Sequence, residues 1–221
     1  MVICTTVNKE FNEFFKKYID DTKYVIIKNP SLFDTIDRDD ITLLKYRHYK
    51  ISNFDSTTKK YLFEYSCENN HLKIAKWLHS LCDIHVILDE KYLFRKCCKN
   101  GHLDIAKWLF ALWEIYVDLD SVFLAACANK RLNIAQWTLP KFDIINDNTI
   151  NIAFVWSCQN DCIEVAQWLY TLGYLRDNTF FRDAFRYSCE NGHLNVAKWL
   201  CTLSPRYSIE VTGDKIKYII N

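Results

Sequence analysis

The sequence predicts an all-α protein built as a stack of helical hairpins, a solenoid, because one phrase recurs along most of the chain. Five tryptophans fall at residues 77, 108, 137, 168 and 199, at intervals of 31, 29, 31 and 31. A period in this range is typical of stacked helical units, in which each unit covers the apolar face of its neighbour. The prediction rests on the period and not on any single residue.

Each copy repeats more than the tryptophan. A cysteine lies ten residues before it, a phenylalanine lies four residues before that cysteine, and an asparagine follows the cysteine by two. An alanine and a β-branched residue precede each tryptophan by two and three places. We predict that the repeated rings form the structural core, and these are Phe63, Phe94, Phe123, Phe154 and Phe185 with Trp77, Trp108, Trp137, Trp168 and Trp199.

The apolar positions within a unit follow helical spacing. The phenylalanine, the residue before the cysteine and the cysteine itself occupy offsets 0, +3 and +4, which place them on one face of a first helix. The Leu, Ile or Val, Ala, Trp and Leu that follow form a wide apolar stripe on a second helix. Between the helices, Gly101 and Gly192 can adopt positive φ, and Asn70 and Asp161 tolerate it. Lys130 is the exception, and we expect a strained or rebuilt turn there.

We divide the chain into an N-terminal capping segment, residues 1–30, and a repeat region, residues 31–221. The repeat region comprises a degenerate first repeat (31–60), five clear repeats (about 61–203) and a half repeat or cap (204–221). In the last segment the frame places Ile216 and Ile220 in the Phe and Cys positions. This placement predicts either a closing helix or a repeat that is cut short.

Composition limits the compartment and the partners. A net charge of +1 offers no overall attraction to nucleic acid or to an anionic membrane. No apolar run approaches the roughly 18 residues of a membrane span, and the first residues lack the pattern of a secretory signal. The repeated cysteines should lie about 10 Å from one another, beyond disulfide reach. We therefore expect apolar cysteines and an intracellular, reducing compartment such as the cytoplasm.

Three units carry a spacing that could supply two zinc ligands each: Cys67-x-x-x-His71, Cys98-x-x-x-His102 and Cys189-x-x-x-His193. A four-ligand site needs two such pairs to converge, whereas stacked units hold them apart. We predict no metal site, and histidines that bond to backbone near the turns. The chain also lacks a glycine-rich phosphate loop and the G-x-S-x-G and H-E-x-x-H motifs. We predict no catalytic residues, no cofactor and no enzymatic activity.

The residues around the turns resemble those of a known family. Residues 100–109, N-G-H-L-D-I-A-K-W-L, and their twin at 191–200 resemble the N-G-H-L-E-V-V-K-L-L phrase of ankyrin repeats. The Trp-for-Leu exchange and the Phe and Cys positions resemble the ankyrin-repeat proteins of giant, mimivirus-like DNA viruses that infect amoebae. The resemblance covers about residues 31–203. It implies an ankyrin-type helical-hairpin solenoid that curves and binds proteins through its concave side.

The chain departs from the ankyrin pattern in two ways. The T-P-L-H opening is absent, with Tyr92-Leu93-Phe94-Arg95 in its place. The units are also shorter than the usual 33 residues, so the connectors should be short or irregular. Tetratricopeptide and leucine-rich repeats fit less well, because their periods and their W-x-x-L-G-x-x-Y and L-x-x-L-x-L patterns are missing.

We predict that a partner binds the face of the first helix opposite the Phe and Cys positions, which would line the concave side under the ankyrin resemblance. The residues at offsets −3, −2 and +1 from each cysteine lie there. The candidates are Tyr65, Arg95, Lys96, Lys99, Leu124, Val155, Trp156, Arg186 and Tyr187. Tryptophan, tyrosine and arginine are typical of binding hot spots. The alternative is that Trp156 and Tyr187 pack on neighbouring first helices or on the connectors.

The predicted function is a non-enzymatic scaffold that acts as a monomer and binds another protein, with a host factor as one candidate under the viral resemblance. The alternative is a structural or assembly role through self-association. Nucleic-acid binding through Arg95, Lys96 and Lys99 is disfavoured, because this basic cluster is one repeat wide and has acidic neighbours. We expect no membrane partner either.

Overall fold

The computed structural model describes residues 32–50, 54–81, 89–113, 117–142, 147–175, 178–212 and 215–220. This part of the chain is mostly helical, and it ends in a small antiparallel sheet. Its residues form two compact units, 1–88 and 89–221, which are described separately. The predicted capping segment and most connector residues lie outside the described residues. No helix within the described ranges is long and apolar enough to cross a membrane.

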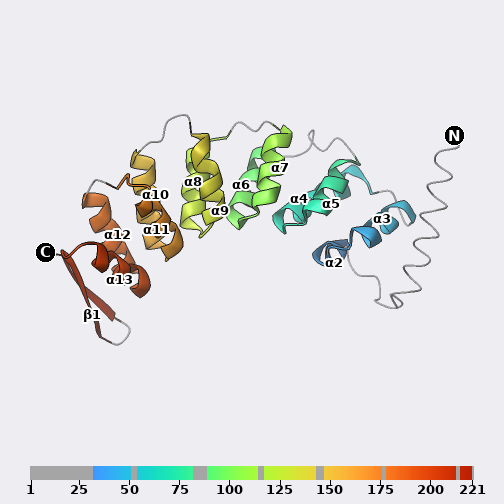
Figure 1. Cartoon of the computed structure of the whole chain (residues 1–221). Helices are drawn as coiled ribbons and strands as arrows, with labels where there is room; N and C mark the ends of the chain where they lie inside the picture. The colour runs from blue at the N-terminus through green and yellow to red at the C-terminus, as the bar shows by residue number, and fades with distance from the viewer. Residues whose placement is uncertain are drawn as a thin grey trace. The chain divides into compact units, whose positions relative to one another are not determined.

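The first unit contains two helix pairs in its described part (Figure 1). Their helices are α2 (Leu32–Asp37), α3 (Ile41–Lys50), α4 (Ser56–Glu68) and α5 (Leu72–His79). Helix α2 contacts both α3 and α4, so the two pairs pack on each other through their first helices. The α2–α3 pair occupies the segment that we interpreted as a degenerate first repeat. Its two fully buried apolar residues are Ile36 and Leu44.

The second unit continues the same alternation of first and second helices (Figure 1). The first helices are α6 (Glu90–Asn100), α8 (Leu119–Ala128), α10 (Asp147–Gln159) and α12 (Asn178–Glu190). The second helices are α7 (Leu103–Trp113), α9 (Leu132–Thr138), α11 (Ile163–Thr171) and α13 (Leu194–Leu203), with the 3-10 turn η2 (Leu139–Lys141) after α9. Each first helix contacts its own second helix and the first helix of the next pair. Consecutive pairs therefore lie side by side in sequence order.

Every described pair turns at a residue with positive φ, and these residues recur with the period of the sequence. They are Asp39, Asn70, Gly101, Lys130, Asp161 and Gly192, with φ of 52°, 67°, 87°, 61°, 57° and 77°. In each turn the next N–H donates to the carbonyl five residues earlier, at 2.8–3.1 Å. This bond defines a Schellman motif. Lys130 adopts the common turn, so the turn is not rebuilt there, although a lysine in this region is strained.

The repeated asparagine has a structural role at these turns. Its side-chain amide donates to the carbonyl four residues earlier in three units, at 2.9 Å for Asn69, 2.7 Å for Asn129 and 2.8 Å for Asn160. The last carbonyls of a helix have no partner within the helix. The asparagine therefore completes the hydrogen bonding of the first helix before the chain reverses.

The repeated rings pack between consecutive units. All five phenylalanines are fully buried, whereas all five tryptophans are only half-buried. Both sets were predicted to lie in the core, whereas the structure places the indoles at its edge. Three of them lie against the phenylalanine of the preceding helix pair. Three successive interfaces show this contact with centroids 6.2–6.3 Å apart and planes at 62–63°, and the pairs are Phe94–Trp137, Phe123–Trp168 and Phe154–Trp199. The same aromatic pair thus joins consecutive helix pairs at these three interfaces of the second unit.

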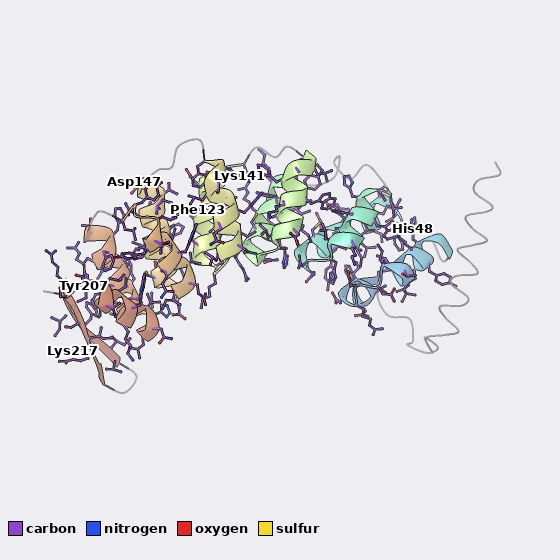
Figure 2. The ribbon with its side chains drawn as sticks, viewed as in Figure 1. His48, Phe123, Lys141, Asp147, Tyr207 and Lys217 are labelled. Atoms are coloured by element: carbon purple, nitrogen blue, oxygen red, sulfur yellow. The ribbon has the colours of Figure 1, made fainter. Side chains whose placement is uncertain are left out.

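The C-terminal segment forms a β-hairpin, not the closing helix or half repeat that the sequence frame predicts. Strand β1 (Tyr207–Thr212) pairs antiparallel with β2 (Lys215–Ile220), and Thr212 lies opposite Lys215. The hairpin packs on α12 and α13 (Figure 1). The Tyr207 ring lies 4.7 Å from that of Phe185 and stacks on Phe181 at 5.6 Å. Figure 2 marks Tyr207 at this position. The hairpin therefore covers the last repeated phenylalanine.

Candidate partner-binding surface

The candidate surface consists of residues on the first helices of the second unit. We define it by the residues at offsets −3, −2 and +1 from the repeated cysteine on α6, α8, α10 and α12, and call it the first-helix face. Because these helices contact one another in order, their triplets are neighbours. The remaining candidate, Tyr65, belongs to the first unit.

Helix α6 supplies the charge of the first-helix face. Lys91, Arg95 and Lys99 are exposed and follow one another at intervals of four, so they form a basic stripe along one side of the helix. None of the three forms an ion pair with a carboxylate in the described part of the chain. The predicted candidate Lys96 is half-buried, and its ammonium lies 5.7 Å from the centroid of the Tyr92 ring. Sequence analysis missed Lys91, which its spacing from Arg95 could have revealed.

Helix α8 presents small side chains to the first-helix face. Leu124, Ala125 and Ala128 are all half-buried. At the N-terminus of α8, the carboxylate of Asp118 accepts hydrogen bonds from the Ser121 hydroxyl and from the backbone N–H groups of Asp120 and Ser121. The bond from Ser121 is the main cause that lowers the pKa of Asp118 below its ordinary value. The charge of Arg95 adds to the same shift.

Helix α10 places a tryptophan at the surface. Trp156 is 41% exposed, and its indole has no aromatic contact and no hydrogen bond within the described residues. Val155, predicted beside it as a binding residue, is only 8% exposed. Helix α10 is flanked by both α8 and α12, so a side chain on its flank is covered by a neighbouring helix. The prediction of Val155 as a surface residue is therefore wrong.

Two candidates on α12 are engaged with partners in the same helix. The Arg186 guanidinium lies 3.4 Å from the Asp183 carboxylate and 4.7 Å from the centroid of the Tyr187 ring. Both Arg186 and Tyr187 are half-buried. The described contact of Tyr187 is with its own helix, so it does not test the alternative in which Tyr187 packs on a neighbouring first helix or a connector. Trp156 is the exposed aromatic residue of the first-helix face.

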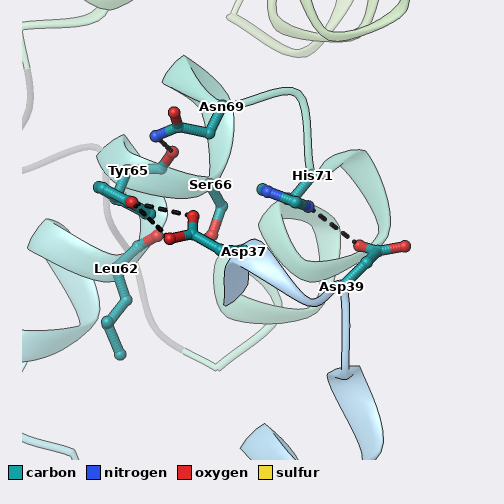
Figure 3. Close-up of polar contacts among 7 residues, drawn as sticks. All are labelled: Asp37, Asp39, Leu62, Tyr65, Ser66, Asn69 and His71. Atoms are coloured by element: carbon teal, nitrogen blue, oxygen red, sulfur yellow. Dashed lines mark hydrogen bonds and ion pairs between the residues drawn. The ribbon is translucent and has the colours of Figure 1, made fainter. Parts of the chain in front are cut away.

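Tyr65 in the first unit connects consecutive helix pairs. Its hydroxyl lies 2.8 and 3.0 Å from the two carboxylate oxygens of Asp37 (Figure 3). Its ring meets that of Phe33 edge to face, with the centroids 4.7 Å apart. The hydrogen bond to Asp37 raises the pKa of the Tyr65 phenol. Nearby, His71 Nδ1 lies 3.2 Å from the carboxylate of Asp39 (Figure 3). The described contacts of Tyr65 are internal to the repeat array.

A contact across the same sequence separation occurs near the C-terminal end of the described chain. The Tyr218 hydroxyl donates to the Glu190 carboxylate at 3.2 Å, across the same 28 residues that separate Tyr65 from Asp37. In the first unit this contact joins offset −2 of one helix pair to offset +1 of the pair before it, whereas Tyr218 lies on strand β2 and not on a first helix. The sequence position that corresponds to Asp37 before Trp156 is Ala128, whose side chain offers no hydrogen-bond acceptor.

The residues that follow the turns form hydrogen bonds between neighbouring helix pairs. In the second unit, His193 Nε2 lies 2.9 Å from the Gln159 carbonyl, and Arg131 Nε donates to the Lys99 carbonyl at 3.0 Å.

The eight described cysteines form no disulfide, and burial raises the pKa of the Cys98 thiol to about 12. No group of three or more His, Cys, Asp or Glu residues in the described ranges is placed to hold a metal ion.

Comparison with known proteins assigns no family to this chain. No family model matches it, and no curated protein matches it. The function of the first-helix face is therefore inferred from its own residues and contacts.

Proposed function

We propose that this protein is a non-enzymatic scaffold of the ankyrin type that binds a partner protein through the first-helix face of α6, α8 and α10. The exposure of Trp156 is the observation that carries the proposal. A tryptophan exposes roughly 250 Å² when free, so an exposed fraction of 41% corresponds to about 100 Å². Burying that area on a partner would contribute about 2.5 kcal/mol, which is the range of a binding hot spot.

The ankyrin assignment is supported by the order of the local structures. Each unit consists of a first helix, a turn with positive φ and a second helix, and the N-G-H-L phrase lies at two of the turns. In ankyrin-type arrays the first helices line the side that contacts partners. The sequence resemblance further suggests a viral protein that acts in the host cytoplasm on a host factor.

The proposal of a non-enzymatic role is supported by the protonation of the described thiols and by the contacts of the described histidines. Burial raises the pKa of Cys98 to about 12 and that of Cys189 to about 11, so neither thiol is ionised at neutral pH. His71 and His193 contact neighbouring units, and His48 accepts a hydrogen bond from the Phe54 amide at 3.2 Å. These groups are used to hold the fold.

A capture experiment with matched variants tests the proposal. The wild-type chain, Trp156→Ala combined with Arg95→Glu, and the control Tyr170→Ala are used to capture proteins from lysate. Tyr170 is also 41% exposed but lies on the second helix α11, so its loss should leave the captured protein bound. The Trp156 and Arg95 variant should lose it while keeping the wild-type circular dichroism spectrum. Undiminished capture by that variant would reject the first-helix face as the binding surface.

Self-association is a second candidate function, and the hairpin is the observation that favours it. The hairpin exposes Val211 by 49%, Ile219 by 40% and Ile220 by 39%. Its two strands pair only with each other in the described chain, and open strand edges are sites of intermolecular pairing. Sedimentation velocity distinguishes the two functions, because a strict monomer over a wide range of concentrations would disfavour assembly.

A further inference from the structure

We infer that the partner presents an extended acidic segment, separated by about five residues from a bulky apolar side chain. The carboxylates of this segment contact the basic stripe on α6, and the apolar side chain packs on Trp156. The inference rests on the proposed function, because it names the chemistry that the same surface would bind.

The basic stripe has the properties of a binding site for carboxylates. Lys91, Arg95 and Lys99 are exposed, lie on one side of α6 and form no ion pair within the described part of the chain. Like charges four residues apart destabilise a helix, so a partner that supplies carboxylates relieves a repulsion within α6 as well as forming new contacts. The carboxylate of Asp118, whose pKa is lowered in part by the charge of Arg95, is held by Ser121 and the backbone of α8.

The first-helix face carries no charged residue between the stripe and the tryptophan. Helix α8 contacts both α6 and α10, and its residues on this face are Leu124, Ala125 and Ala128. The positions of the first-helix face on α6, α8 and α10 include no acidic residue, so nothing there repels an acidic chain. Helix α12 carries the acidic residues Asp183 and Glu190, which would repel an acidic partner. We therefore place the acidic segment of the partner on α6, α8 and α10. Methyl groups allow a peptide backbone to approach α8 closely.

The helix spacing determines the length of the segment. Packed helices lie about 8–10 Å apart, so α6 and α10, separated by α8, are about 16–20 Å apart. An extended chain covers about 3.3–3.6 Å per residue, so about five or six residues connect the two subsites. A nucleic acid fits less well, because its phosphates need cations along the whole path, and only α6 supplies them.

Selection from a random peptide library tests the inference on the full chain. We expect the enriched peptides to carry two or more Asp or Glu residues with an apolar residue about five positions away, in either direction. Enrichment of peptides without acidic residues, or failure to enrich any peptide, would overturn the inference. A single-stranded oligonucleotide that binds more tightly than the best peptide would overturn it as well.

Charge reversal on the stripe then locates the peptide. With the best peptide labelled by a fluorophore, Arg95→Glu combined with Lys99→Glu should raise Kd at least about tenfold and abolish its dependence on salt. The control Lys107→Glu, on the exposed side of α7, should leave Kd unchanged. Trp156→Ala should raise Kd about 30-fold. An unchanged Kd in the Arg95 and Lys99 variant, or a Kd that rises equally in the control, would refute the assignment to α6.

Two variants distinguish a failure of the acidic-segment inference from a failure of the proposed binding surface. A captured partner protein that is lost on Trp156→Ala but retained on Arg95→Glu with Lys99→Glu would overturn the acidic segment and leave the scaffold function standing. A partner that is retained by both variants would overturn the surface itself.

Discussion

The aromatic contact between units can be tested by a double-mutant cycle on Phe123 and Trp168. Phe123 is fully buried, so Phe123→Ala should lower the free energy of unfolding by about 3–5 kcal/mol. Trp168 is half-buried, so Trp168→Ala should cost about 3 kcal/mol, at the lower end for this change. The two rings lie 6.2 Å apart at 63°, an edge-to-face geometry worth about 0.5–1.5 kcal/mol. The double variant should therefore lose about 1 kcal/mol less than the sum of the single losses.

Urea unfolding followed by circular dichroism measures each free energy by linear extrapolation. The matched control is the cycle of Phe123 with Trp199, whose indole contacts Phe154 in another interface. Residues without shared contacts should be additive within about 0.5 kcal/mol. Additive losses for Phe123 and Trp168, or an equal coupling in the control, would refute the idea that this ring pair joins consecutive units.

Three further predictions follow from the turns, caps and thiols. Lys130→Gly removes a lysine from the left-handed region and should stabilise the protein by about 0.5–1 kcal/mol, seen as a melting temperature about 2 °C higher; an unchanged or lower value would contradict the strain. The folded-state pKa of Asp118 is lowered by Ser121, so its stabilisation is complete above the ordinary Asp pKa and is lost as the pH falls through the lowered value. Asp118→Asn should flatten the stability profile below about pH 4, and a profile like that of the wild type would contradict this. With the two cysteines outside the described residues changed to serine, Ellman's reagent should label Cys201 first, because the other described cysteines are buried; faster labelling of Cys98 would contradict the burial.

The features that repeat could be predicted from the sequence because identical units need identical backbone. The turn at Gly101 must have the same shape as the turn at Lys130 if the helices on either side are to stack alike, and the six positive φ values confirm this. The fully buried phenylalanine position follows from the same requirement. The partial exposure of the tryptophans could not be predicted in this way. An apolar stripe on a helix shows which face points toward the neighbouring unit, but it does not show how much of each side chain that unit covers.

The candidate surface was predicted less well, because the exposure of a residue on a first helix depends on the unit before it. The Tyr65 hydroxyl donates to the carboxylate of Asp37, whereas the position that corresponds to Asp37 before Trp156 is Ala128, which offers no acceptor, and Trp156 is exposed. Both residues occupy offset −2, and a consensus over the repeats treats them as equivalent. Only pairing each offset −2 with the preceding offset +1 separates an internal contact from a surface residue.

The C-terminal hairpin shows how one set of apolar residues can satisfy two periods. Ile216 and Ile220, four residues apart, suit one face of a helix, and they also suit one face of a strand if Tyr218 points the same way. The Tyr218 ring lies 6.0 Å from that of Phe185, and Tyr218 and Ile216 are half-buried, whereas Ile220 at the end of β2 is exposed. The sequence between the two runs distinguishes the helical period from the strand period. Gly213 and the aspartate after it separate two alternating runs of six residues, which is a strong hairpin signal. A frame carried forward by counting alone cannot detect that change of period.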